Sequence, residues 1–173
     1  MSIKHLNEPG FLILEMSVAH WPAVVQIYKQ GIDTGFATFE KEIPSYQQWN
    51  RNHISSCRLV ALRDDKVLGW AALSPVSGRC VYGGVAEVSV YVANTAQNLG
   101  IGKLLMEELI TTSEKEGFWT LQSGIFPENT GSIKLHEKTG FRYLGKRERI
   151  GQLDGIWKDN ILFERRSEIV GIN

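Results

Sequence analysis

The stretch from Val85 to Leu109 constrains the fold most, because a strand pattern passes directly into a helix pattern there. Val88, Val90 and Val92 alternate with more polar residues, which is the period-two pattern of a strand with two different faces. After a polar loop, leucines and isoleucines recur every three or four residues up to about Glu116, which predicts an amphipathic helix. The chain therefore needs a fold in which a strand leads through a short loop into a helix.

Two glycines, Gly100 and Gly102, stand at the start of this predicted helix. They leave the backbone amides of the first turn uncovered by side chains, and such amides at the positive end of a helix dipole bind phosphate groups. No Asp or Glu occurs from Asn94 to Met106, and Lys103 lies where the dipole disfavours a cation unless an anion is bound. The loop is therefore predicted to bind an anion. A glycine-bearing turn without a ligand is the alternative.

Two common phosphate-binding motifs do not fit this loop. A P-loop needs Ser or Thr after its Gly-Lys pair, but Leu104 follows Lys103. A dinucleotide-binding fingerprint needs a third glycine, and Leu105 occupies that position.

The loop sequence Q-N-L-G-I-G at 97–102 resembles motif A of the GNAT N-acetyltransferases, Q/R-x-x-G-x-G/A at a strand–loop–helix junction. The resemblance implies that the loop and helix start bind the pyrophosphate of acetyl-CoA. It also implies a bulge in the preceding strand, which separates that strand from its neighbour and admits the pantetheine arm. Asn129 and Ser132 match contacts to the cofactor, although both are also ordinary helix-start residues. The expected cofactor-binding residues are Val90, Tyr91, Val92, Gln97, Asn98, Leu99, Gly100, Ile101, Gly102, Lys103, Asn129 and Ser132.

Several further segments resemble the phosphinothricin acetyltransferase branch of this family. They are A-T-F-E at 37–40, R-x-x-Y at 79–82, A-E-x-S-V-Y-V at 86–92, L-H-E at 135–137 and G-x-W-x-D at 155–159. The resemblance implies transfer of an acetyl group to the α-amine of a small amino-acid-like substrate, such as phosphinothricin, methionine sulfoximine or methionine sulfone. It also implies a homodimer. We expect direct transfer in a ternary complex, because neither cysteine stands in a motif suited to carrying an acetyl group.

The hydrophobic patterns predict a single α/β domain over residues 1–173. The family resemblance implies the GNAT fold, a mixed central β-sheet of about seven strands flanked by about four helices. Strands are expected at 11–16, 58–63, 67–73, 85–92, 119–125, 141–150 and 156–164, and helices at 21–32, from 44, from 100 to about 116 and at 130–139.

Acetyl transfer to an amine needs a proton acceptor, because a primary amine with a pKa of about 10.4 is less than about 0.1% neutral at pH 7. Glu87, on the polar face of the central strand, is the candidate base. A glutamate that faces solvent or pairs with a lysine is the alternative. His136, where many relatives carry tyrosine, is the candidate acid for the departing thiolate, and a structural histidine is equally compatible with the sequence.

The resemblance also suggests an acceptor pocket. Arg79 is the candidate for bidentate binding of the substrate carboxylate, with a plain surface arginine as the alternative. Aromatic side chains beside an acidic residue can enclose a small cation, although a single phenylalanine is more often part of a core. The expected substrate-binding residues are Phe36, Phe39, Glu40, Arg79, Tyr82 and Glu87.

Composition limits the other function classes. Lys plus Arg and Asp plus Glu number 19 each, which leaves no net field to attract nucleic acid or an anionic membrane. No apolar segment reaches the length of a membrane span and the N-terminus lacks a signal-peptide pattern, so a cytoplasmic protein is expected. Cys57 and Cys80 lack partners at metal-ligand spacing, and we expect no metal. Acetylation of another small amine or a protein N-terminus, or a CoA-binding sensor without catalysis, are the alternative functions.

Overall fold

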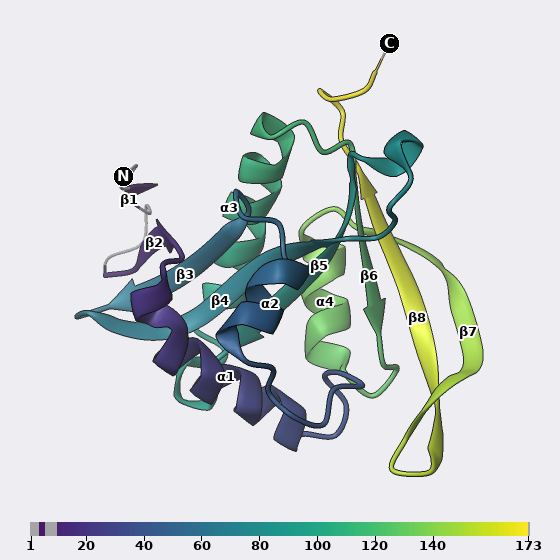
Figure 1. Ribbon diagram of the computed structural model, residues 1–173, viewed down its shortest axis with the longest axis horizontal. Helices are drawn as coiled ribbons and strands as arrows, with labels where there is room; N and C mark the ends of the chain where they lie inside the picture. Colours follow the sequence, from purple (N-terminus) through teal and green to yellow (C-terminus); the bar gives the residue numbers. More distant parts are fainter. Residues whose placement is uncertain (1–3, 6–9, 173) are drawn as a thin grey trace.

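A mixed sheet of eight strands, in the order β1-β2-β3-β4-β5-β6-β8-β7, runs through the residues that the computed structural model describes, 4–5 and 10–172 (Figure 1). Every neighbouring pair is antiparallel except β5 and β6, which are parallel. This arrangement confirms the expected GNAT fold, and the two-residue β1 is an additional strand. The strands are β1 Lys4–His5, β2 Leu12–Glu15, β3 Arg58–Arg63, β4 Lys66–Pro75, β5 Val85–Val92, β6 Thr120–Ile125, β7 Arg142–Leu153 and β8 Ile156–Arg166.

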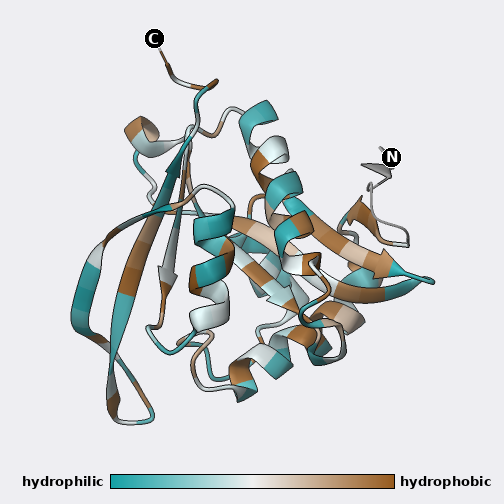
Figure 2. Cartoon of the chain, turned by 180° about the vertical axis from the view of Figure 1, so that it is seen from behind, coloured by the Kyte–Doolittle hydropathy of each residue, from teal (hydrophilic) through white to brown (hydrophobic). Residues whose placement is uncertain are grey.

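Four α-helices cover the two faces of this sheet. Helices α1 and α2 lie on the face seen in Figure 1, and α3 and α4 lie on the opposite face, seen in Figure 2. The helices are α1 Trp21–Asp33, α2 Tyr46–Asn52, α3 Ile101–Lys115 and α4 Thr130–Lys138, and short 3-10 turns occur at Val18–His20, Cys80–Tyr82 and Asn94–Ala96. The predicted helices agree with these bounds within a few residues. Helix α2 begins at Tyr46 because the hydroxyl of Ser45 caps it and accepts a hydrogen bond from the amide of Gln48.

The core is divided by the central strands β4 and β5, whose side chains alternate between the two helical layers. On the α1 side, the rings of Trp70 and Tyr91 stack at 4.7 Å, and Tyr28 of α1 contacts both rings edge-on. Burial raises the pKa of Tyr28 to about 12, so its phenol stays protonated at neutral pH. On the α3 side, Leu105 is fully buried and lies against Gly69. The end of β5 is therefore held firmly between two packed layers.

The close packing of α1 on Tyr91 gives a test of this arrangement. A Cβ at Gly31 would lie 2.5 Å from the Tyr91 ring, which is too close for any side chain. Although alanine favours a helix over glycine by about 1 kcal/mol, we expect Gly31→Ala to lower the free energy of unfolding by about 1–3 kcal/mol, because the ring must move. Urea denaturation measures this change.

The matched control is Gly131→Ala in the first turn of α4, where an added Cβ would meet nothing within 4 Å. This variant should be as stable as the parent protein or more stable, by up to about 1 kcal/mol. A Gly31→Ala protein that is equally stabilised would contradict the packing of α1 against Tyr91.

Candidate active site

Strands β5 and β6 are paired only at their beginning. This agrees with the expectation that β5 separates from a neighbouring strand. Their parallel register covers Val85 to Glu87, and within the described residues β5 has no partner on this side from Val88 to Val92. On its other side, β5 stays paired with β4 through Val92, without any shift of register. The bulge expected from the resemblance is therefore wrong for this pairing, and the strands separate because each follows a different neighbour. The free edge of β5 contains the residues predicted at 90–92.

The first turn of α3 lies beside this free edge. Gly100 is the N-cap residue with φ at 80°, and no side chain caps the helix. The first hydrogen bond of the helix joins the Leu104 amide to the Gly100 carbonyl at 3.1 Å, so the amides of the preceding turn have no partner within the helix. A Cβ at Gly102 would lie 3.6 Å from Val92 of β5 and 3.4 Å from Leu135 of α4. The predicted anion-binding turn therefore lies where β5, α3 and α4 meet.

The other loop residues lie around this turn. Asn98 has a left-handed backbone with φ at 62°, and Leu99 is about half exposed at 48%. The Gln97 amide donates to Asn94 Oδ1 at 3.2 Å. The Lys103 ammonium is paired with Glu107 Oε1 at 2.7 Å. Lys103 therefore does not by itself require an external anion, because the helix supplies its own carboxylate one turn later. A contact of Lys103 with acetyl-CoA stays a prediction.

Asn129 and Ser132 form the start of α4. The Asn129 Oδ1 accepts a hydrogen bond from the Ser132 amide at 3.1 Å, so Asn129 acts as an ordinary N-cap. The sequence analysis gave an ordinary helix-start residue as the alternative for Asn129. This capping role is compatible with a contact to the cofactor. A contact of either residue with acetyl-CoA stays a prediction.

His136 lies in the core between α4 and the sheet. Its side chain is only 3% exposed and packs edge-on against Phe141 at 4.9 Å. The ring Nδ1 donates a hydrogen bond to the Ser132 carbonyl at 2.8 Å, while the buried Nε2 has no partner among the described residues. Burial lowers the pKa of His136, which favours the neutral ring with its proton on Nδ1. The geometry therefore favours the structural role over the predicted general acid, because this proton is already engaged.

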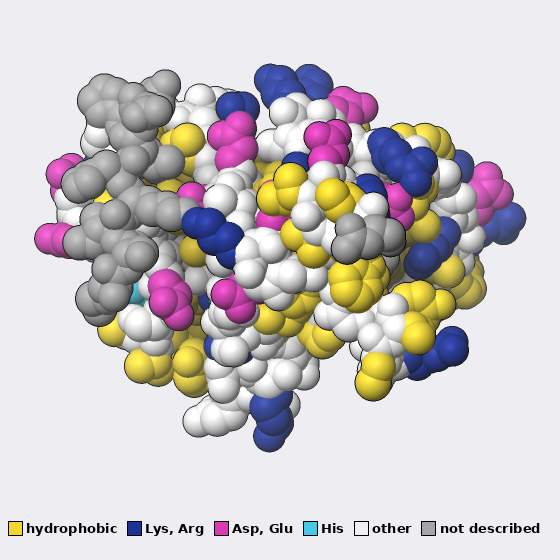
Figure 3. Space-filling model, turned by 90° about the horizontal axis from the view of Figure 1, so that it is seen from above, with side chains coloured by type: hydrophobic (Ala, Val, Ile, Leu, Met, Phe, Trp, Pro, Cys, Tyr) yellow, Lys and Arg dark blue, Asp and Glu magenta, His cyan; other side chains and the backbone are white. Residues whose placement is uncertain are grey.

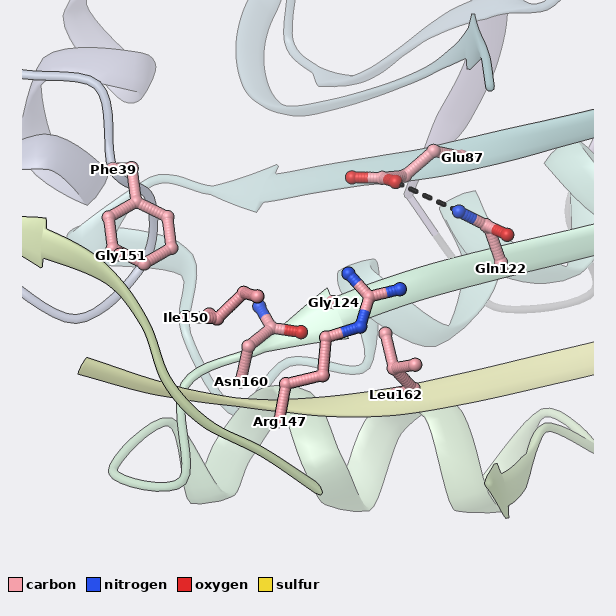
Figure 4. A pocket seen from close by; sticks show the side chains of 9 residues that line it. All are labelled: Phe39, Glu87, Gln122, Gly124, Arg147, Ile150, Gly151, Asn160 and Leu162. Atoms are coloured by element: carbon pink, nitrogen blue, oxygen red, sulfur yellow. Dashed lines mark hydrogen bonds between the residues drawn. The ribbon is translucent and has the colours of Figure 1, made fainter. Parts of the chain in front are cut away.

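A pocket of about 240 Å³ lies on the face of the sheet that carries α1, because its residue Glu87 shares a face of β5 with Tyr91, which packs against α1. Glu87 projects into it from β5, and the Gln122 amide of β6 donates to Glu87 Oε2 at 3.2 Å (Figure 4). The volume suits a molecule of amino-acid size, because pockets for drug-sized ligands are larger, about 300–1,000 Å³. The lining residues are Phe39, Glu87, Gln122, Gly124, Arg147, Ile150, Gly151, Asn160 and Leu162.

Two glycines allow the pocket walls to approach the sheet. A Cβ at Gly124 of β6 would lie 2.7 Å from Asn160 Oδ1, so glycine lets the Asn160 amide lie across this strand. A Cβ at Gly151 of β7 would lie 2.9 Å from the Phe39 ring, which packs edge-on against Phe126 at 4.6 Å. The loop after α1 and the hairpin of β7 and β8 thereby meet over the pocket.

Only part of the predicted acceptor site is gathered here. Glu87 and Phe39 line the pocket, but the other predicted substrate-binding residues are not among its lining residues. Arg79 and Tyr82 lie together on the loop before β5, with the guanidinium 5.6 Å from the ring centre. The remaining two predicted residues, Phe36 and Glu40, lie on the loop that carries Phe39.

Sequence reasoning missed the pocket residues of β6, β7 and β8. Gln122, Arg147 and Asn160 belong to no motif that the sequence analysis used. The turn at Asp154-Gly155 predicted the β7–β8 hairpin correctly, but β8 lies between β6 and β7 in the sheet. Which hairpin residues face Glu87 depends on this strand order and on the register shift between Arg147 and Gly151.

In the part of the chain that the structure describes, no group of three or more His, Cys, Asp and Glu side chains is arranged to hold a metal ion. None of its helices combines the length and apolar character that a membrane span requires. On the face shown in Figure 3, acidic and basic side chains are interspersed.

Comparison with known proteins finds a family model and a curated relative that match most of the chain. The family model described as the acetyltransferase (GNAT) family matches residues 21–141. The phosphinothricin N-acetyltransferase of Alcaligenes faecalis is 33% identical over 151 residues, which cover 83% of this chain and 76% of the relative.

Two solved structures are similar over most of the chain. The ribosomal-protein-alanine N-acetyltransferase of Brucella melitensis has a TM-score of 0.84 at 32% identity, covering 90% of this chain and 99% of the other. A GNAT superfamily phosphinothricin acetyltransferase of Sinorhizobium meliloti, solved in complex with acetyl-CoA, has a TM-score of 0.84 at 27% identity, covering 95% and 92%.

The buried state of His136 gives a prediction for pH dependence. Because the pKa of His136 is lower in the folded protein than the usual value of about 6.5, the unfolded chain binds more protons between these two values. The free energy of unfolding should therefore fall as the pH decreases below about 6.5. His136→Phe removes this contribution, and its stability should depend less steeply on pH between about 7 and 5.5.

Urea denaturation at several pH values measures how steeply the free energy of unfolding changes with pH in the parent protein and in His136→Phe. Other titrating groups, such as His53, are present in both proteins and do not contribute to the difference. Parallel curves would show that His136 titrates normally in the folded state. A folded His136→Phe variant that retains turnover would also exclude the residue as the proton donor.

Proposed function

Because the chain belongs to the acetyltransferase (GNAT) family, we propose that it transfers the acetyl group of acetyl-CoA to the α-amine of a small amino-acid-like substrate. Phosphinothricin, methionine sulfoximine and methionine sulfone are the proposed type of acceptor, which the phosphinothricin N-acetyltransferase of Alcaligenes faecalis supports by its similarity. The observation that carries the proposal is the position of Glu87. Its carboxylate lies in a small pocket at the last point where β5 and β6 are paired.

The first turn of α3 fits the pyrophosphate of acetyl-CoA. Its amides lack partners within the helix, and no acidic side chain occurs in this turn. Acetyl-CoA supplies an acetyl group activated as a thioester. The free edge of β5, residues 88–92, would receive the thioester end, because it begins next to Glu87 and ends next to Gly102.

Glu87 is the proposed base. Deprotonating a typical primary ammonium at pH 7 costs about 4.6 kcal/mol, so a carboxylate near the amine is needed. Glu87 is exposed to the pocket, and Gln122 orients one of its oxygens. The anionic carboxylate would first bind the ammonium and then accept its proton, directly or through a water molecule. Backbone amides along the free edge of β5 would stabilise the negative charge that develops on the carbonyl oxygen.

We propose direct transfer in a ternary complex, because the two substrates would approach the separation of β5 and β6 from opposite faces of the sheet. The pocket of Glu87 and the turn at Gly102 do not compete for the same space. A homodimer belongs to the same proposal. Exposed apolar side chains on the β7–β8 hairpin, Tyr143 at 58% and Trp157 at 55%, support it.

Acetylation of a protein N-terminus is the second candidate function. The likeness to the ribosomal-protein-alanine N-acetyltransferase of Brucella melitensis favours it. An N-terminal residue within a polypeptide has no free α-carboxylate, so the two candidates differ in whether the acceptor must carry an anionic group beside its amine.

Glu87→Gln tests the base. The amide cannot accept a proton from the ammonium, so kcat at neutral pH should fall by about 10²- to 10⁴-fold while the affinity for acetyl-CoA changes little. A thiol-release assay with methionine sulfone measures kcat, and calorimetry measures the binding of acetyl-CoA. The control is Glu148→Gln, which removes a carboxylate paired with Lys146 on the exposed β7 strand and should leave kcat unchanged. Equal turnover of Glu87→Gln and the parent protein would show that Glu87 is not the base.

Gly102→Val tests the proposed binding of the acetyl-CoA pyrophosphate at the first turn of α3. A branched side chain there would extend from the first turn of α3 toward Val92 and Leu135, so the affinity for acetyl-CoA should fall by about tenfold or more. Calorimetry measures the affinity, and circular dichroism checks that α3 is intact. Gly78→Val, where an added Cβ has no neighbour within 4 Å, serves as the control. Unchanged binding in the Gly102 variant would place the pyrophosphate elsewhere.

A further inference from the structure

The pocket of Glu87 contains a second charged side chain, of opposite sign. Arg147 of β7 extends its guanidinium into the pocket on the side that faces Glu87 and Gln122 (Figure 4). The Arg147 side chain makes no hydrogen bond or ion pair with the residues that the structure describes, whereas Arg142 and Lys146 of the same strand are paired. Lys146, for example, lies 3.2 Å from Asp159. The Arg147 charge is thus available to a ligand.

Glu87 and Arg147 are also not paired with each other. The Glu87 carboxylate accepts a hydrogen bond from Gln122 and makes no ion pair with the residues that the structure describes. One small pocket therefore presents an anion and a cation that do not satisfy one another, an arrangement complementary to a ligand that carries an ammonium and an anionic group. A guanidinium binds carboxylates in a bidentate manner that a lysine cannot reproduce.

Asn160 adds an uncharged group to the same pocket. Its Oδ1 is buried and has no hydrogen-bond partner among the described residues, although a buried acceptor without a partner destabilises the folded protein. The amide is held close to β6, where Gly124 leaves room for it. Asn160 lines the pocket, so a rotation of its amide would present Oδ1 to a ligand that donates to it.

We propose that Arg147 binds the anionic group of the acceptor while Glu87 and Asn160 Oδ1 accept hydrogen bonds from its ammonium. This inference rests on the proposed function and makes Arg147 and Asn160 the residues that determine its specificity. It moves the anion contact from Arg79, which does not line the pocket, to an arginine of the β7–β8 hairpin. Amines without an anionic group, polyamines and protein N-termini are then poor acceptors, because they leave Arg147 unpaired.

The test compares acceptors that differ only in the carboxylate. Methionine sulfone and its decarboxylated form, 3-(methylsulfonyl)propylamine, are assayed by thiol release with the parent protein, Arg147→Ala and Arg147→Lys. Arg147→Ala should raise the KM for methionine sulfone by about ten- to a hundredfold with little change in kcat, and leave the KM of the amine nearly unchanged. Arg147→Lys should restore part of the loss, because the charge returns without the bidentate geometry.

Phosphinothricin and its decarboxylated form distinguish the two possible anions of the acceptor. If Arg147 binds the α-carboxylate, the decarboxylated compound should be insensitive to Arg147→Ala. If Arg147 binds the phosphinate, the same compound should lose affinity in the variant. Asn160→Leu should raise the KM of all these acceptors, including the simple amine, because the ammonium is common to them.

Arg149→Ala is the matched control. It removes the same charge from the same strand, outside the pocket, while the backbone amide at 149 keeps its hydrogen bond to Asp159. Thermal melts check that each variant is folded. This control should show the KM values of the parent protein.

The outcomes separate this inference from the proposed function. Turnover of the parent protein with a uniform change of KM in Arg147→Ala, or with no change, would overturn the role of Arg147 and leave the proposed function intact. A selective effect in Arg79→Ala but not in Arg147→Ala would return the anion contact to the loop before β5. Absence of turnover with every acceptor in the parent protein would overturn both.

Discussion

The candidate site depends on the loss of pairing between β5 and β6 partway along β5. At its beginning this strand is paired on both sides, with β4 and β6, but after Glu87 only β4 remains. Strands in a twisted sheet diverge readily where their hydrogen bonds end, and β6 is held on its other side by β8 as far as Ile125. The end of β5 keeps its strand conformation without a second partner because its side chains are packed on both faces of the sheet. Tyr91 is stacked on Trp70 within the core on one face, and the first turns of α3 cover the other.

The separated strands lie between two regions of different electrostatic character. On the α3 side, an uncapped helix start presents backbone amides, which favour phosphate oxygens. On the other side, Glu87 and Arg147 provide one negative and one positive side chain in a small pocket. Neither region requires a net charge on the protein, which agrees with its balanced composition. The groups that could attract an anion are local, because they are backbone amides and single side chains.

Glycines make this arrangement possible at several contacts where a larger residue would collide. Gly31 of α1 leaves room for the Tyr91 ring. In the same way, Gly124 of β6 leaves room for the Asn160 amide, and Gly151 of β7 leaves room for the Phe39 ring. The last two contacts form the walls of the pocket. The hairpin of β7 and β8 and the loop after α1, which are more than a hundred residues apart in the chain, are thereby brought together over Glu87.

The sequence by itself determined the elements, the fold family and the glycine-containing loop before α3, because these depend on short-range patterns. The alternation in β5, the stripe of α3 and the glycines at 100 and 102 all lie within one continuous stretch. It also indicated Glu87, because alternation along a strand assigns its face. Only the tertiary structure placed Arg147 and Asn160 beside Glu87, kept Arg79 out of that pocket and buried His136 among aromatic rings. The physical reason is that strand order, register shifts and close contacts between distant segments decide which side chains meet, and no local pattern contains them.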